Sequence, residues 1–305
     1  MDELLEDLVQ KYLPFTNQGQ LANYIPELTK VDKNALGIYV VSSDGKSSFA
    51  GDYQKRFTMQ SIIKPILLLL ALMDNGADLV REHVGVEATG KPFDAINYTD
   101  QALLSEHLNP MVNMGAILLC TLLSGKNYSH KFQRLLELTR NLSGNSEIQV
   151  NEAVYESEKR TGNRNRALAF LLKSQGIIQD EVEDVLDCYF RACSIEADCK
   201  DLANIAFVFA NRGRRPVSEE RLFPAHYAHY VNAILMTCGM YDGSGDFAIR
   251  VGVPAKSGVG GGIMAITPTR MGIGIYSPGL DTKGNSLAGI QVLEELSQKL
   301  YLSVF

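Results

Sequence analysis

The sequence lacks the residues and spacings that mark several functional classes. It contains no tryptophan, and its five cysteines form no Cys-x-x-Cys pair. Neither a disulfide framework nor a four-thiolate zinc site is therefore indicated, and buried, reduced thiols are expected. The five histidines show no His-Glu-x-x-His spacing, so the sequence predicts no metal site.

Clustered positive charge and long hydrophobic runs are also missing. The formal net charge is −6 and the Lys and Arg residues are scattered, so nucleic acid is not an expected partner. The longest apolar run, Ile66 to Met73, is far shorter than the roughly 20 residues that a bilayer requires, and no membrane span is expected. The N-terminal segment MDELLEDLVQKYLPF is acidic and amphipathic, unlike a secretory signal, which favours a cytoplasmic protein.

The pattern of apolar residues changes twice along the chain. A helix is expected at about residues 2–12, and residues 36–52 predict a β-hairpin because β-branched and aromatic residues flank Asp44-Gly45. From Ser61 to about residue 230 the apolar spacing is mostly helical. Three β-rich runs follow residue 246, namely DFAIRVGVPAKSG, GGIMAITPTR and MGIGIYSPG, and a last helix is expected at about 285–300.

This order predicts an α+β fold in which both ends of the chain share one antiparallel sheet. We expect a single domain over residues 1–305. Residues 1–60 and 230–305 should form the part with the sheet, and residues 61–229 a mostly helical subdomain.

The segment MQSIIKP places a serine and a lysine at the start of a long apolar helix. Ser61 and Lys64 are three residues apart and would share one helix face, and Pro65 is suited to a first turn. Unpaired N–H groups at a helix start favour developing negative charge, and apolar surroundings lower the pKa of a lysine. A neutral lysine could then take the serine proton. The alternative is a capping serine with a lysine whose ammonium reaches solvent.

The Ser-x-x-Lys spacing alone is weak, because it also occurs at Ser43 and Lys46 on the predicted hairpin turn. A second motif supports Ser61. Lys256-Ser257-Gly258, within PAKSGVGGG, has the form of the Lys-Ser/Thr-Gly strand that accompanies Ser-x-x-Lys in penicillin-recognising serine enzymes. That strand borders the nucleophile and supplies one N–H of an oxyanion hole. The glycines match neither phosphate-binding pattern, and no cofactor is expected.

Together with YIPEL, NPMVNMG, VYESEKRTGNRNRALA, CYFRACS, LMTCGMYDGSGDFAIRVGVPAKSGVGGG and GNSLAGI, these motifs resemble the serine-dependent glutaminases over nearly the whole chain. The resemblance implies a β-lactamase/transpeptidase-like fold, with an antiparallel sheet flanked by helices and an all-helical subdomain. It implies hydrolysis of L-glutamine to L-glutamate and ammonia. It also implies a homo-oligomer, a dimer or a tetramer.

The resemblance assigns roles to five residues near the reacting amide. Ser61 would be the nucleophile and Lys64 its general base. Tyr189 in CYFRACS would relay protons to the leaving group, and Tyr241 in GMYDG would stand over the substrate. The N–H of Val259 in KSGVGGG would share the oxyanion hole with that of Ser61.

Four further residues match positions that hold the amino acid in the family. Glu158 is the only carboxylate among them and should bind the ammonium, while Asn113, Asn165 and Tyr24 could donate to the α-carboxylate. Taken alone, Glu158 and Asn165 would belong to a solvated helix surface and Asn113 to a helix cap. Tyr189 and Tyr241 would be half-buried core residues.

The sequence departs from the usual family wording at two positions. Met114 stands beside Asn113 where alanine is common, and Asp94 stands where asparagine is common. A larger side chain and an added anion could retune the pocket without removing a catalytic group. Lys256 is expected only to support its strand and the local charge. Two alternatives stay open from the residues, a β-lactamase or penicillin-binding enzyme and an inactive amino-acid sensor.

Overall fold

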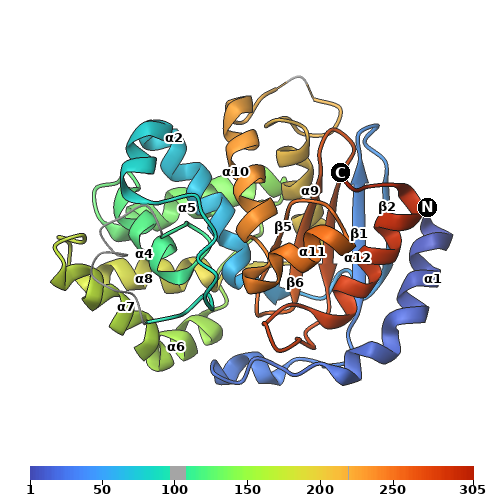
Figure 1. The fold of residues 1–305 in the computed structure, drawn as a ribbon, viewed down its shortest axis with the longest axis horizontal. Helices are drawn as coiled ribbons and strands as arrows, with labels where there is room; N and C mark the ends of the chain where they lie inside the picture. Colours follow the sequence, from blue (N-terminus) through green and yellow to red (C-terminus); the bar gives the residue numbers. More distant parts are fainter. Residues whose placement is uncertain (97–107, 219) are drawn as a thin grey trace.

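A five-stranded antiparallel sheet joins the two ends of the chain in the computed structural model, which describes residues 1–96, 108–218 and 220–305 (Figure 1). The strand order is β2-β1-β7-β6-β5. The strands are β1 (Gly37–Ser42), β2 (Ser47–Gly51), β5 (Ala255–Ser257), β6 (Gly262–Thr267) and β7 (Met271–Tyr276). The predicted α+β class and the shared sheet are thus confirmed.

Alternating side chains divide the sheet between two hydrophobic cores. Ile38, Val40 and Ile273 face one core with helices α1 (Asp2–Tyr12), α11 (Ser244–Arg250) and α12 (Leu287–Leu300). Tyr39 and Val41 face the other core with α9 (Cys199–Ala210). This is the two-sided burial that a period of two residues produces in a strand.

Helix α9 lies very close to β7 because two glycines leave room for it. A Cβ atom at Gly272 would lie 2.1 Å from the carbonyl oxygen of Ala203, and one at Gly274 would lie 2.1 Å from that of Cys199. The sequence-based division places α9 in the helical subdomain, whereas its main contact is with the sheet. The division itself stays a prediction.

The remaining helices form the helical side of the molecule, at the left of Figure 1. They are α2 (Lys64–His83), α4 (Asn113–Leu122), α5 (Tyr128–Ser143), α6 (Glu152–Thr161), α7 (Asn163–Ser174), α8 (Val182–Cys193) and, next to the sheet, α10 (Ala225–Cys238). Every residue of α2 from Lys64 to Leu72 is buried. Gly76 interrupts α2 with a φ of 80°, a conformation that glycine adopts without strain.

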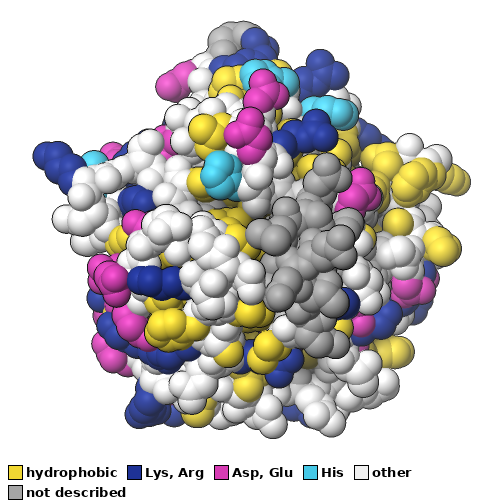
Figure 2. Space-filling model, turned by 60° about the vertical axis from the view of Figure 1, so that its left-hand side comes forward, with side chains coloured by type: hydrophobic (Ala, Val, Ile, Leu, Met, Phe, Trp, Pro, Cys, Tyr) yellow, Lys and Arg dark blue, Asp and Glu magenta, His cyan; other side chains and the backbone are white. Residues whose placement is uncertain are grey.

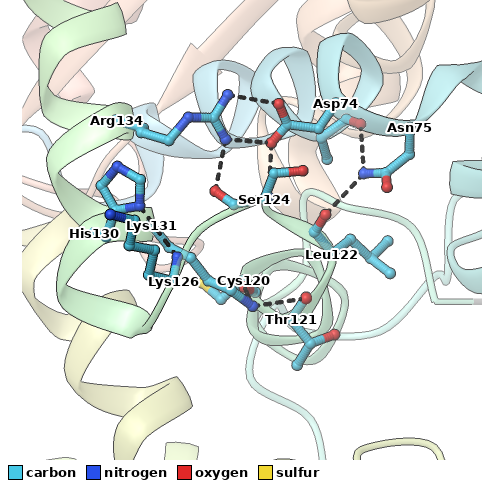
Figure 3. Close-up of polar contacts among 11 residues, drawn as sticks. Asp74, Asn75, Cys120, Thr121, Leu122, Ser124, Lys126, His130, Lys131 and Arg134 are labelled. Carbon is cyan, nitrogen blue, oxygen red and sulfur yellow. Dashed lines mark hydrogen bonds and ion pairs between the residues drawn. The ribbon is translucent and has the colours of Figure 1, made fainter.

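The middle of α2, just before Gly76, is tied to its neighbours by polar contacts (Figure 3). The Asp74 carboxylate accepts hydrogen bonds of 2.6 Å from both Arg134 terminal nitrogens and one of 2.8 Å from the Ser124 N–H. Asn75 donates to the Leu122 carbonyl at 2.7 Å, and Lys131 donates to the Thr121 carbonyl at 2.9 Å. These contacts satisfy the last carbonyls of α4 and fix α2 against α4 and α5.

Two local predictions need correction. The run that begins at Asp246 was expected to be a strand, but residues Ser244–Arg250 form helix α11. Its apolar residues Phe247 and Val251 are both buried and four apart, and Arg250 pairs with Glu294 on α12, so a helical face suits this segment. The helix expected to start at Ser61 begins as a 3₁₀ turn, Gln60–Ile63, before α2.

Two searches of the described residues concern membranes and metals. Within these residues, no helix is long and apolar enough to cross a bilayer, and no group of three or more His, Cys, Asp or Glu side chains could hold a metal ion. On the face drawn in Figure 2, positive and negative side chains are intermixed.

Candidate active site

The turn that carries Ser61 is held against the glycine-rich segment after β5. A Cβ atom at Gly258 would lie 2.5 Å from the Met59 carbonyl oxygen, and one at Gly260 would lie 2.4 Å from that of Thr58. Only residues without side chains permit this approach. The structure thereby brings the two sequence motifs, almost two hundred residues apart, into backbone contact.

The Ser61 turn is also strained. Gln60 has a φ of 49°, in the left-handed region that a β-carbon disfavours. Ser61 itself is 7% exposed. Among the described residues, neither the Ser61 N–H nor the Val259 N–H donates a hydrogen bond. Two such N–H groups are available to an oxyanion.

Lys64 is fully buried at the first turn of α2. Its ammonium donates hydrogen bonds to the Met111 carbonyl at 3.0 Å and to Asn113 Oδ1 at 2.7 Å. Burial lowers the pKa of Lys64 to about 8, although Cys193, Glu158 and Asp94 oppose the shift. The pKa of Lys64 is therefore lowered, as the sequence predicted. Among the described residues, its hydrogen bonds go to Met111 and Asn113 and not to Ser61.

Asn113 links this lysine to a second asparagine. Asn113 lies at the start of α4 and is 8% exposed. Its Nδ2 donates to Asn165 Oδ1 on α7 at 2.9 Å. The structure thus brings Lys64, Asn113 and Asn165 together in one hydrogen-bonded row.

Glu158 lies inside the molecule rather than on a solvated helix surface. It is 5% exposed, and its Oε2 atom has no hydrogen-bond partner among the described residues. Burial raises the pKa of Glu158 to about 8, against the opposing effects of a contact with Gln60 and of the Lys64 charge. A buried carboxylate with one free oxygen is suited to a cationic ligand.

Three tyrosines were also expected in the site. Tyr189 on α8 is 2% exposed, and burial raises its pKa far above the usual value. Tyr241 has a φ of 57°, and its buried hydroxyl has no partner of standard hydrogen-bond geometry among the described residues. Its pKa is raised by burial, an effect that the nearby Ser61 opposes. Tyr24 is 53% exposed as a residue, but its hydroxyl lies near Tyr241 and Glu158. Loss of hydration, followed by the nearby Tyr241 and Glu158, raises the pKa of this hydroxyl.

Three residues near the site were either not predicted from the sequence or were given only a supporting role. Gln60 touches Glu158, and its only signal was its place before Ser61. Cys193 lies near Lys64 and Glu158, and its signal was a spacing of four from Tyr189 on one helix. Lys256 is fully buried, and its ammonium lies 4.2 Å from the centre of the Tyr241 ring.

The two departures from the family wording have separate surroundings. Met114 is buried in the helical core. Asp94 forms an ion pair with Arg164, with 2.8 Å between Asp94 Oδ2 and Arg164 Nε. The added anion is thus paired with Arg164, yet it is near enough to Lys64 to oppose the lowering of its pKa.

Comparison with known proteins identifies the family. The family model described as Glutaminase matches residues 19–305. Glutaminase 2 of Clostridium perfringens (strain 13 / Type A) is 51% identical over 305 residues, and glutaminase of Clostridium tetani (strain Massachusetts / E88) is 50% identical, each match covering 100% of both chains. The chain belongs to the glutaminase family. It is therefore a glutaminase, an enzyme that hydrolyses the side-chain amide of L-glutamine.

Solved structures of the family share the fold. A probable glutaminase from Bacillus subtilis, complexed with 6-diazo-5-oxo-L-norleucine, is 40% identical with a TM-score of 0.91, covering 100% of this chain and 97% of that chain. The covalent complex between the Bacillus subtilis glutaminase YbgJ and 5-oxo-L-norleucine is 39% identical with a TM-score of 0.91, covering 100% and 99%. The predicted β-lactamase-like fold is confirmed.

Proposed function

We propose that this glutaminase works through an ester between Ser61 and the γ-carbonyl of glutamine. Neutral Lys64 takes the Ser61 proton, and the serine oxygen attacks the side-chain amide carbon. The tetrahedral oxyanion accepts hydrogen bonds from the N–H groups of Ser61 and Val259. Tyr189 passes a proton to the departing nitrogen, ammonia leaves, and water then hydrolyses the ester to release glutamate.

The observation that carries this proposal is the environment of Lys64. The amine is fully buried, its two hydrogen bonds among the described residues go to neutral oxygen atoms, and burial lowers its pKa to about 8. A general base works best when its pKa is near the working pH. Catalytic hydrogen bonds often form only with substrate bound, and we expect the contact between Ser61 and Lys64 to form in that complex.

Glu158, Asn113, Asn165 and Tyr24 hold the amino-acid end of glutamine in this proposal. The free Glu158 oxygen binds the ammonium, and Asn165 and Tyr24 donate to the α-carboxylate. Asn113 is committed through Oδ1 to Lys64 and through one Nδ2 hydrogen to Asn165. Its second Nδ2 hydrogen is left for the substrate.

The test compares ammonia release from L-glutamine by the wild type, Ser61→Ala and the matched control Ser43→Ala, with L-asparagine as the control substrate. We expect Ser61→Ala to lose activity and Ser43→Ala to keep it. Mass spectrometry after treatment with 6-diazo-5-oxo-L-norleucine should locate an adduct on Ser61. Full activity of Ser61→Ala, or a preference for asparagine, would contradict the mechanism.

The homo-oligomeric state and the cytoplasmic location stay predictions. Light scattering on the purified protein measures the first, and cell fractionation measures the second. A monomer at micromolar concentration, or a secreted protein, would contradict them.

A further inference from the structure

A cluster of charged and polar side chains joins α6, which carries Glu158, to α8, which carries Tyr189. The Tyr155 hydroxyl donates to Asp187 Oδ1. Lys159 donates to the same Asp187 oxygen at 2.7 Å and to the Tyr155 hydroxyl oxygen at 2.8 Å. One carboxylate on α8 therefore holds two side chains of α6, placed four residues apart on one helix face.

Arg191 on α8 completes this cluster. Its Nε atom donates to Asp187 Oδ2 at 3.0 Å, and its guanidinium lies 4.0 Å from the centre of the Tyr155 ring. A longer ion pair of 3.7 Å reaches Glu152 on α6. Both oxygens of Asp187 are thus used, and the Tyr155 ring is 1% exposed beneath the charged groups.

The residues of this cluster flank Glu158 and Tyr189 along the sequence. Glu158 lies between Tyr155 and Lys159 on α6, and Tyr189 lies between Asp187 and Arg191 on α8. A slide or rotation of α6 against α8 would therefore move the carboxylate that faces the ammonium relative to the tyrosine that faces the leaving group. The cluster resists both movements because it contacts each helix at two positions one turn apart.

We propose that Asp187 is a positioning residue, which fixes the spacing between Glu158 and Tyr189 by holding α6 against α8 through Tyr155, Lys159 and Arg191. This inference rests on the proposed function, since it assumes that Glu158 binds the substrate ammonium. A fixed spacing between Glu158 and Tyr189 makes the enzyme select substrates by the distance between their α-ammonium and the reacting amide.

The experiment measures kcat/KM for L-glutamine and for 4-carbamoylbutanoate, which has the same amide arm but no α-ammonium. The variants are Asp187→Asn and Tyr155→Phe. The matched control is Glu183→Gln, which breaks an ion pair of 2.9 Å between α8 and Arg166 of α7. The readout is the ratio of the two kcat/KM values, which does not depend on the folded fraction of a preparation.

We expect Asp187→Asn to lower this ratio by about tenfold and Tyr155→Phe by about threefold, because small misplacements of binding groups are costly. Glu183→Gln should leave the ratio unchanged. A purely structural role would lower activity toward both substrates equally. An unchanged ratio in Asp187→Asn would therefore overturn the inference.

Two further outcomes separate this inference from the proposed function. If Asp187→Asn does not fold, the ratio in Tyr155→Phe decides, and a wild-type ratio there overturns the inference. A wild type that hydrolyses both substrates equally well overturns the assignment of Glu158 and the inference together. If the wild type prefers glutamine but the ratio of the two kcat/KM values is unchanged in both variants, only the inference about Asp187 is overturned.

Discussion

The two Ser-x-x-Lys segments of this chain place the same residues at the same spacing in opposite surroundings. Lys46 lies in the turn between β1 and β2, where its ammonium is 2.9 Å from Asp44 Oδ2 and its side chain is 84% exposed. The hydrogen bond to Asp44 raises the pKa of Lys46. Lys64 is fully buried and has no ion pair with any residue that the structure describes, and burial lowers its pKa to about 8.

This difference shows that the surroundings of a lysine, and not its spacing from a serine, set its pKa. The apolar residues of α2 remove water from Lys64, and its hydrogen-bond acceptors, Met111 and Asn113, carry no charge. A nearby hydrogen-bonded carboxylate would hold the lysine protonated, as Asp44 does for Lys46. The serine partner differs as well, because only Ser61 lies beside the glycine-rich segment.

The largest expected effect separates the two lysines. Lys64→Met keeps the apolar stem but removes the proton acceptor, so kcat for glutamine hydrolysis should fall by about a thousandfold. Lys46→Met should leave kcat unchanged. Steady-state ammonia assays on both variants measure the difference, and a Lys64→Met enzyme within a few fold of the wild type would show that another group accepts the proton.

The pH profile sharpens the comparison. The proposed mechanism requires neutral Lys64 and ionised Glu158, and burial brings the pKa of both groups to about 8. Because both protons must leave, kcat/KM should rise by more than about tenfold per pH unit below pH 8 and flatten above it. In Glu158→Gln only the Lys64 proton must leave, so the remaining kcat/KM should rise by at most about tenfold per pH unit. A flat wild-type profile from pH 6 to pH 9 would contradict the role of Lys64.

The smallest effect concerns stability. Asp74 is nearly buried and holds both Arg134 and the Ser124 N–H, so Asp74→Ala should lower the free energy of unfolding by about 2 kcal/mol. Asp44→Ala in the exposed hairpin turn should cost less. Urea denaturation measures both, with activity per folded molecule unchanged in Asp74→Ala. Equal losses in the two variants would contradict the role of the Asp74 cluster.

Local patterns were sufficient for much of the fold. Asp44-Gly45 predicted the hairpin, and Gly45 has a φ of 79° as such a turn requires. The strand prediction failed at α11, because FAIRV is short, and its β-branched residues suit either conformation until its packing against α12 decides. The 3₁₀ turn before α2 could not be predicted from MQSIIKP, since the segment packs against Gly258 and Gly260, which are almost two hundred residues away in sequence.

The candidate site was less accessible to local patterns than the fold. Ser61 and Lys64 emerged from spacing and helix position, but Glu158 lies in a segment whose charges predict a solvated surface. Only the resemblance to the glutaminases indicated that Glu158 belongs to the pocket, and the structure buries it. The contacts of Gln60 and Cys193 depend on tertiary packing that no local pattern contains.

The pairing of β1 with β7 has a consequence for how the chain is made. Gly37 lies opposite Tyr276 in the sheet, so β1 leaves the ribosome long before the strand that covers its second edge. During synthesis β1 can pair only with β2, and most of the helical segments emerge before the sheet can close. Contacts between residues so far apart in sequence form slowly and expose strand edges meanwhile. The nascent chain therefore depends on completing its last strands before the sheet and the Ser61 turn take their final form.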